Sequence, residues 1–401
     1  MEKSNKKLFT AFVGIIFSLA LAGCQNPFLQ LGKEAVASAV SSPFAQSASP
    51  EYVYQDGTEE YPFLVYDVAT LKRVGSEAAG PAAWDMTKYY LQIKDIEWDK
   101  HENWTPIGDG KIFTGTYDGN GKIISGLTCN YPSVDGHYYD SIGLFSKLYY
   151  GTVKGLGLVD AYIEGATAVG GIAGENYYGT IQNCYFTGSV IGEFRTGGIA
   201  GYSNGVIENC YANGSFHGDS LTGGIVGGMV YGTVKNCYSI GNCSVTRYGV
   251  GGVVGEIQGD TSGRIPGQIL NCYSTAKVEG ANYETGGIAG GILYNAALFD
   301  CVALNQSISG DPRDEIGRVL GSVGGPISNN YAWGGIEVNG DDEINGNHDD
   351  KNGESIAPSQ YNDLEWWTSE NWYYEEAWDF DTVWEWDADR QLPVLRGVGG
   401  Q

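Results

Sequence analysis

A repeated glycine pattern constrains this chain more than any other feature of its sequence. The pattern Gly-Gly-aliphatic-small-Gly recurs at spacings of 27, 26, 28 and 35 residues, beginning at Gly170, Gly197, Gly223, Gly251 and Gly286. A second pattern, Asn-Cys-Tyr, runs in step with it, beginning at Asn183, Asn209, Asn236 and Asn271. One such unit is too short to bury an apolar face alone, so the copies are expected to stack into a continuous core.

The composition of the repeat units indicates that they stack as β-strands and not as helices. They are rich in Gly, Asn, Thr and β-branched residues, which are poor helix formers, and they read as short strands broken by Gly and Asn turns. Fainter copies begin at Ser141 and Ile316, which gives about eight units between residues 109 and 340. We therefore predict an all-β chain, a right-handed parallel β-helix (solenoid) of about eight coils.

The Asn-Cys-Tyr triplet predicts where side chains point, because neighbouring residues of a strand face opposite sides. The asparagines are placed at a corner. The cysteines are predicted to form an interior file, namely Cys184, Cys210, Cys237, Cys272 and Cys301. We expect these thiols to be free, because an odd number of cysteines at one repeated slot argues against a disulfide framework.

The tyrosines of the triplet are predicted to form an exterior file: Tyr185, Tyr211, Tyr238 and Tyr273. An exposed aromatic stripe is unusual on a soluble surface and suggests a contact surface, for sugar faces or for another protein. The alternative is that the stacked rings only stabilise neighbouring coils. These four tyrosines are the candidate binding residues.

The first residues predict an exported protein. A basic start and an apolar run from Leu8 to Ala22 are typical of a signal peptide over residues 1–23. The stretch Leu21-Ala22-Gly23-Cys24 resembles the lipobox of bacterial lipoproteins, which implies that Cys24 is lipidated and becomes the mature N-terminus. An ordinary cleaved signal with a chance cysteine is the alternative. Gln25 replaces the Asp that retains such proteins in the inner membrane, so we expect a lipid anchor in the outer membrane or at the cell surface.

Four further regions follow the signal. Residues 24–58 are rich in Ser, Ala and Gln and predict a flexible tether. Residues 59–108 predict an N-terminal cap of strand, short helix and strand, followed by the repeats at 109–340 and by an acidic loop with a C-terminal cap at 341–401. All ten tryptophans lie outside residues 105–332. A narrow coil has no room for indole, so we expect these tryptophans to cover the open ends.

The charge of the chain limits its partners. A formal net charge of −25 disfavours nucleic acid, which requires a basic footprint. In the acidic loop, Asp341, Glu343 and Asn345 imitate the opening of a calcium loop, but the twelfth position is Asn352 rather than Glu. We predict a solvated insertion there, no metal or other cofactor, and a monomer; calcium binding is the alternative.

Ser203 lies in the stretch Gly201-Tyr-Ser-Asn-Gly205, which matches the nucleophile elbow Gly-x-Ser-x-Gly. That motif needs a strand–turn–helix context. Here the first glycine belongs to the repeat and no helix is expected to follow. We predict that Ser203 is a turn residue and not a nucleophile.

Three landmarks in order resemble the GLUG-motif proteins, which are repeat-rich secreted or surface proteins of bacteria. They are "WTPIGDGKIFTGTYDGNGKIISGL" from Trp104, the repeats themselves, and "WDFDTVWEWDADRQLPVLR" from Trp378. The resemblance covers about residues 60–396 and implies a parallel β-helix rod at the cell surface. Similar repeats accompany immunoglobulin A-cleaving metallopeptidases, but the four histidines of this chain lack the His-Glu-x-x-His spacing. The resemblance therefore implies no catalytic residues.

Together these features predict a non-catalytic, lipid-anchored protein of the cell envelope that presents a binding surface to a glycan or an extracellular protein. Two alternatives remain open, a polysaccharide-degrading lyase or hydrolase and a purely structural spacer. The fold alone does not decide between them.

Overall fold

The computed structural model describes residues 55–401 except 81, 134–139, 261–266, 312–314, 370–371 and 375–377. The predicted signal peptide, the lipid attachment at Cys24 and most of the tether lie outside these residues. The chain divides into two units, Met1–Pro62 and Phe63–Gln401. All that follows concerns the second unit.

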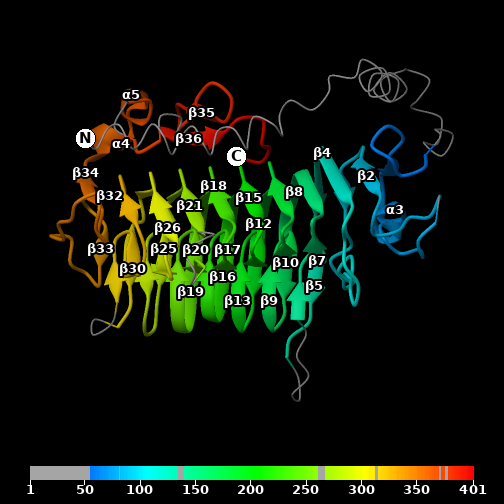
Figure 1. Ribbon diagram of the computed structural model, residues 1–401, viewed down its shortest axis with the longest axis horizontal. Coiled ribbons are helices and arrows are strands. Elements are labelled where there is room, and N and C mark those ends of the chain that lie inside the picture. The colour runs from blue at the N-terminus through cyan, green and yellow to red at the C-terminus, as the bar shows by residue number, and fades with distance from the viewer. Residues whose placement is uncertain are drawn as a thin grey trace. The chain divides into compact units, whose positions relative to one another are not determined.

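The second unit is a parallel β-solenoid of about nine turns, so the predicted fold class is confirmed (Figure 1). A first parallel ladder runs along the whole solenoid. In order, its strands are β1 (Phe63–Val65), β2 (Tyr89–Gln92), β4 (Thr116–Ser125), β8 (Thr152–Glu164), β11 (Thr180–Gln182), β15 (Val206–Glu208), β18 (Thr233–Lys235), β21 (Gln268–Leu270), β26 (Ala297–Phe299) and β31 (Ile327–Ser328).

Beyond a corner, the same sheet continues into a second ladder. Its strands are β12 (Tyr185–Ile191), β16 (Tyr211–Gly223), β19 (Tyr238–Gly251), β22 (Tyr273–Ser274), β27 (Val302–Ala303), β32 (Tyr331–Trp333) and β34 (Glu354–Ile356). Shorter strands complete the turns: β3 (Ile96–Glu97), β5 (Thr128–Asn130), β6 (Asp140–Ile142), β9 (Thr167–Gly170), β13 (Phe194–Gly197), β23 (Lys277–Glu279), β24 (Thr285–Gly286), β28 (Ser307–Ser309), β29 (Ile316–Gly317) and β33 (Glu337–Val338).

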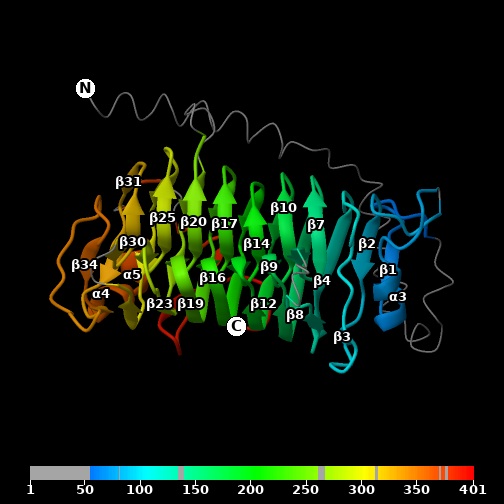
Figure 2. The ribbon, with the colours of Figure 1, turned by 90° about the horizontal axis from the view of Figure 1, so that it is seen from below.

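The glycine pattern leads into a separate seven-stranded parallel sheet. Its strands run side by side in one direction (Figure 2): β7 (Phe145–Tyr149), β10 (Ala173–Tyr177), β14 (Ala200–Ser203), β17 (Val226–Val230), β20 (Val254–Gln258), β25 (Ala289–Leu293) and β30 (Leu320–Val323). The glycines are required because adjacent turns come very close. A Cβ atom on Gly198 would lie 2.3 Å from the carbonyl oxygen of Gly224, and a Cβ on Gly224 would lie 2.3 Å from that of Gly252.

The interior follows the predicted alternation. Ile207, Cys210 and Ala212 are fully buried in the main core, and all seven described cysteines are free and buried. Each thiol of the file lies against a backbone carbonyl, as Cys210 Sγ does at 3.2 Å from the oxygen of Glu208. The cysteines therefore serve as small core residues, as predicted.

The asparagines of the triplet form a corner, as predicted. Asn183, Asn209, Asn236 and Asn271 have φ between 51° and 53°, a left-handed conformation that Asn adopts more readily than most residues. The side-chain amides of Asn209, Asn236 and Asn271 each donate to the amide oxygen of the asparagine one turn earlier, at 3.2, 3.0 and 3.2 Å. Backbone preference and side-chain bonding thus favour Asn at the same position.

The predicted N-terminal cap is only partly right. The order of strand, helix and strand is observed, with α3 (Val68–Arg73) between β1 and β2. However, these strands are turns of the solenoid itself, since Phe63 pairs with Tyr90 and Tyr90 with Tyr117, each 27 residues on. Aromatic rings fill the interior of these turns, so the period is kept while the Gly and Asn-Cys-Tyr patterns are lost.

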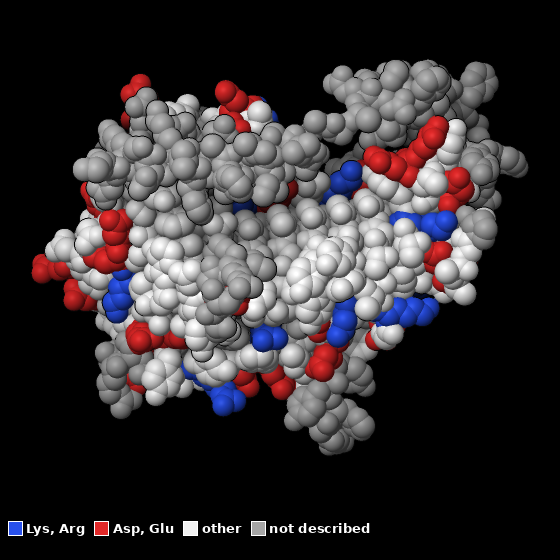
Figure 3. All heavy atoms as spheres, in the orientation of Figure 1, with Lys and Arg blue, Asp and Glu red and all other residues white. Residues whose placement is uncertain are grey.

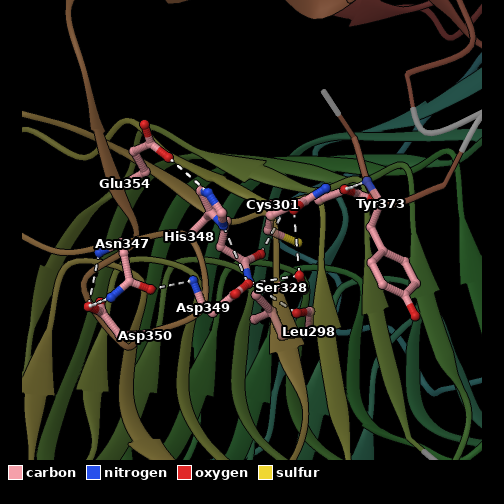
Figure 4. A network of polar contacts seen from close by, with 12 residues as sticks. Leu298, Cys301, Ser328, Asn347, His348, Asp349, Asp350, Glu354 and Tyr373 are labelled. Atoms are coloured by element: carbon pink, nitrogen blue, oxygen red, sulfur yellow. Dashed lines mark hydrogen bonds and ion pairs between the residues drawn. The ribbon is translucent and has the colours of Figure 1, made fainter. Parts of the chain in front are cut away.

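The first part of the acidic loop, Asp341 to Glu343, is exposed to solvent as predicted, and its last residues pack on the final turn of the solenoid. The fully buried Arg318 donates from Nε to the carbonyl of Asn352 at 3.0 Å and from Nη2 to that of Gly353 at 2.8 Å. His348 and its neighbours pack on the last turn, and His348 Nε2 lies 3.2 Å from Glu354 Oε2 (Figure 4). Among the residues that the structure describes, no group of His, Cys, Asp or Glu is arranged to hold a metal ion.

Candidate ligand-binding face

The four predicted tyrosines do point outward and stack on one another. The ring centroids of Tyr185, Tyr211, Tyr238 and Tyr273 follow at 5.1, 5.0 and 4.8 Å, with planes within 5°. These rings, which we call the covered stack, are nevertheless buried, with exposed fractions of 6%, 2%, 0% and 2%. The expectation of an exposed aromatic stripe is therefore wrong.

The C-terminal residues 357–401 cover this stack. They contain α4 (Pro358–Tyr361), α5 (Leu364–Trp367) and the antiparallel strands β35 (Trp384–Asp387) and β36 (Leu392–Leu395), and they run back along one side of the rod (Figure 1). We expected them to close the end of the solenoid. Instead, the Trp384 ring lies 6.2 Å from that of Tyr273, and the Tyr273 hydroxyl donates to the carbonyl of Pro393 at 2.8 Å. A ligand would have to displace this segment to reach the stack.

Asp300 holds the same segment to the solenoid. It occupies the corner slot of the asparagines, with φ of 55°. Its carboxylate accepts the backbone N–H groups of Tyr373 at 2.6 Å and Tyr374 at 3.1 Å, and the Phe299 and Tyr373 rings stack at 4.7 Å. Burial raises the pKa of Asp300 to about 6, against the opposing effect of these two donors.

A different group of tyrosines remains open. It lies where β7 and β10 end at the edge of the seven-stranded sheet, and we call it the tyrosine cluster: Tyr149, Tyr150, Tyr177, Tyr178 and Tyr202. Tyr149, Tyr150 and Tyr178 have exposed fractions of 41%, 64% and 50%. Centroid distances are 5.3 Å between the rings of Tyr150 and Tyr178 and 5.4 Å between those of Tyr177 and Tyr202.

The backbone beneath the cluster forms a corner of the solenoid. Tyr150 and Tyr178 have φ of 55° and 53°, the left-handed conformation that also occurs at the asparagine corner of this chain. Tyr231, at the same corner two turns beyond Tyr178, has φ of 62°. All three begin the triplet Tyr-Gly-Thr, a third periodic pattern that would have revealed this corner from the sequence.

The charges near the cluster are largely paired. Glu175 accepts a hydrogen bond from Ser141 and lies 3.2 Å from Lys147 Nζ. Although burial disfavours its charge, the hydrogen bonds from Ser141 and Tyr177 and the nearby Lys147 hold the pKa of Glu175 below its usual value. On the face shown in Figure 3, acidic side chains gather at the ends and along the upper and lower edges, and the visible white surface between them is largely uncharged.

Two acidic residues further along the same sheet interact directly. Glu284 lies over Gly291, where a Cβ would be 3.1 Å from its Cδ atom, and its carboxyl faces Glu256. Burial, followed by the negative charges of Glu256 and Glu315, raises the pKa of Glu284 to about 7. This side chain was not singled out by the sequence patterns.

Ser203 ends strand β14 and does not lie in the turn where it was predicted, and its contacts are structural. It is fully buried at the end of β14, and its hydroxyl accepts hydrogen bonds from Asn176 Nδ2 and the N–H of Gly205, both at 3.2 Å. The chain continues into β15 and not into a helix. The geometry of a nucleophile elbow is therefore not formed.

Comparison with known proteins identifies the repeats. The family model described as "The GLUG motif" matches residues 165–191, 192–216 and 246–279. This chain carries GLUG repeats. The matched segments contain the glycine patterns that begin at Gly170, Gly197 and Gly251. The structure continues the same architecture between these segments and on both sides of them.

Two named relatives share part of the chain. Halomucin of Haloquadratum walsbyi is 30% identical over 210 residues, which is 47% of this chain and 2% of halomucin. A protein of Evansella cellulosilytica, named as a Gly-rich membrane protein, is 32% identical over 147 residues, 34% of this chain and 16% of that protein. The chain thus spans only a small part of either relative, and the names are consistent with a location at the cell envelope.

A solved structure shares the fold. A protein of Bacteroides ovatus, described as a candidate immunoglobulin A1 protease, superposes with a TM-score of 0.55 at 22% identity and covers 86% of this chain and 94% of its own. At this identity the similarity shows the fold alone. In the described residues, no helix is both long and apolar enough to cross a membrane.

Proposed function

We propose that this GLUG-repeat protein is a non-catalytic, lipid-anchored component of the cell envelope whose tyrosine cluster binds carbohydrate. The observation that carries the proposal is the group of exposed rings at the edge of the seven-stranded sheet. Exposed apolar groups that gather on one face of a soluble protein usually mark an interaction site.

Tyrosine is suited to sugars because it combines a flat apolar ring with a polar hydroxyl at its rim. In the cluster, the rings of Tyr149, Tyr150 and Tyr178 lie in contact with one another. Their backbone belongs to paired parallel strands and tight corners, so little ordering entropy is lost when a ligand binds. A stiff extended rod also offers several equivalent turns along which a long polymer could lie.

The binding test compares two pairs of exposed tyrosines. The full chain, solubilised in detergent, is applied to a glycan array, and the hits are measured by titration. Tyr150→Ala with Tyr178→Ala is expected to weaken binding at least tenfold, because stacked aromatic contacts of about 1 kcal/mol each are lost. The control Tyr283→Ala with Tyr374→Ala removes two exposed rings that lie outside this sheet edge and is expected to bind as the parent does. Equal losses in both variants would refute the role of the cluster.

The lipid anchor is tested separately. Radiolabelled palmitate is expected to be incorporated by cells that make the parent chain and not by cells that make Cys24→Ser, which should accumulate as unprocessed precursor. Stable anchoring is expected because each buried methylene of the acyl chains contributes about 0.8 kcal/mol. Normal maturation of Cys24→Ser would show that lipid is not attached at this residue.

One feature of the structure supports the enzyme alternative. An open hollow beside β3 is lined by Glu97, Asp99 and Asp160, whose side chains are exposed, together with Lys100 and His101. Paired carboxylates are the groups that glycosidases use. Release of reducing or unsaturated ends from a polysaccharide, lost in Asp99→Asn with Asp160→Asn, would favour this alternative over simple binding.

A further inference from the structure

Arg195 lies beside the tyrosine cluster and is electrostatically unsatisfied. In the part of the chain that the structure describes, no hydrogen bond or ion pair joins its guanidinium to another residue, and its Nε atom is buried without a partner. The chain contains 48 acidic and 23 basic residues, so an arginine without a carboxylate partner is unexpected. A buried donor without an acceptor costs about 1–3 kcal/mol and calls for an explanation.

The position of Arg195 is tightly determined. Its backbone is left-handed, with φ of 64°. Its guanidinium carbon lies 4.6 Å from the ring centroid of Tyr202 and 4.8 Å from that of Phe194. A Cβ on Gly228 would lie 3.1 Å from Arg195 Cγ, so the side chain of Arg195 packs closely over this glycine. The fold thus holds a cation on an aromatic ring of the cluster.

Two acidic residues on the neighbouring strands of this sheet are already engaged. Glu175, one strand before Tyr202, is bound by Ser141 and Lys147. Glu256, one strand after Gly228, accepts from Gln258 Nε2 at 2.7 Å. Neither forms an ion pair with Arg195, so the terminal nitrogens of its guanidinium, which unlike Nε are not buried, are open to an acidic group from outside.

We propose that Arg195 and the tyrosine cluster form an anion subsite for an acidic sugar unit. The carboxylate or sulfate of the sugar accepts hydrogen bonds from the guanidinium, and the sugar ring lies against Tyr202 and Tyr177. A planar guanidinium is well matched to both oxyanions, which it can bind through two parallel hydrogen bonds. This inference rests on the proposed function and adds the chemical class of the ligand. Nucleic acid fits less well, because it requires a basic track along the whole polymer.

The test uses polymers that differ only in charge. Binding of the full chain in detergent is measured for polygalacturonate against its methyl ester, and for dextran sulfate against dextran, at about 0.15 M salt, where repulsion by the acidic chain reaches only about 8 Å. We expect at least one anionic polymer to bind about tenfold more tightly than its neutral counterpart, and the better pair identifies carboxylate or sulfate as the group.

Substitutions then assign the preference to Arg195. Arg195→Gln is expected to abolish the tenfold preference, so that the anionic and the neutral polymer of a pair bind this variant equally, and Arg195→Lys to restore only part of the preference. Arg247→Gln removes an exposed arginine elsewhere and should leave the preference intact. Circular dichroism confirms that each variant is folded.

The outcomes separate this inference from the proposed function. If the neutral polymers bind through the tyrosine cluster and the anionic ones bind no better, or if Arg195→Gln keeps the preference, the anion subsite is wrong and the carbohydrate-binding face stands. If no polymer binds and the glycan array is also negative, the proposed function itself fails.

Discussion

The two groups of tyrosines in this solenoid have the same origin and opposite surroundings. The covered stack and the tyrosine cluster both arise from slots that recur once per turn, and in both the rings point away from the core. The covered stack is buried by residues 357–401, whereas Tyr149, Tyr150 and Tyr178 remain exposed. A repeat therefore fixes the direction of a side chain, but a segment outside the repeat decides whether that side chain stabilises the fold or faces a ligand.

The largest expected difference between the two groups is in stability. Tyr238→Ala removes a fully buried ring from the covered stack and is expected to lower the free energy of unfolding by about 3 kcal/mol. Tyr150→Ala removes an exposed ring and should change it by less than about 0.5 kcal/mol. Urea unfolding monitored by tryptophan fluorescence measures both. Similar losses would show that the two groups do not differ as described.

The hydrogen bonds between Asp300 and the covering segment, residues 357–401, provide a second test. Asp300→Ala leaves the backbone N–H groups of Tyr373 and Tyr374 without their acceptor. The free energy needed to open the covering segment is therefore expected to fall by about 2 kcal/mol. Hydrogen exchange should therefore accelerate in residues 357–401 and not at the tyrosine cluster. Asp342→Ala, an exposed acidic residue, is the control. Unchanged exchange in the covering segment would mean that Asp300 does not hold it.

The two regions should also differ in pH dependence. Glu284, on the open sheet, has its pKa raised from 4.5 to about 7, and Asp300, at the cover, from 3.8 to about 6. A group whose pKa is raised by folding gives stability that is present at low pH and lost as the pH rises through the folded value. The free energy of unfolding should thus fall between pH 5 and pH 7.5.

Each substitution should remove its own part of that fall. Glu284→Gln is expected to reduce the decrease in the free energy of unfolding near pH 7, and Asp300→Asn to reduce the decrease near pH 6. Each reduction is about 1 kcal/mol after allowance for solvent screening. Glu343→Gln, at an exposed site, corrects for the general effect of net charge. A parent chain whose stability rises over this interval would contradict both assignments.

The smallest effect concerns the backbone beneath the rings. Tyr178 is left-handed, so Tyr178→Gly should be more stable than Tyr178→Ala by about 0.5–1 kcal/mol, because glycine adopts this conformation without strain. Tyr211 lies in an extended strand, so Tyr211→Gly should instead be less stable than Tyr211→Ala by a similar amount. Thermal unfolding of the four variants measures the difference. The same sign in both pairs would contradict the assigned corner geometry.

The periodic features of the fold could be predicted from the sequence. The spacing of the glycines and the Asn-Cys-Tyr triplet placed Cys210 inside, Tyr211 outside and Asn209 at a corner, because strand alternation and the left-handed preference of Asn are local properties. The first turns escaped prediction because their interior is filled by Phe63, Tyr90 and Tyr117, which keep the 27-residue period without the motif.

The covering segment could not be predicted in the same way. Tyr211 bonds to a residue 188 positions away and Tyr273 to one 120 positions away, and no periodicity links them. The tryptophans of residues 357–401 correctly indicated a cover but not the face that it occupies. The tyrosine cluster could have been predicted from the sequence, because Tyr-Gly-Thr recurs at Tyr150, Tyr178 and Tyr231. The more frequent Asn-Cys-Tyr pattern led instead to the tyrosines of the covered stack, which are buried.

Hydroxyl-radical footprinting read by mass spectrometry tests the central claim most directly, because it reports each tyrosine in the intact chain. Without ligand, Tyr149, Tyr150 and Tyr178 should be oxidised rapidly and the covered stack should be protected. With a bound polysaccharide, the three exposed rings should become protected and the covered stack should not change. Rapid oxidation of the covered stack in the free chain, or a bound polysaccharide that leaves the cluster as reactive as before, would contradict the claim.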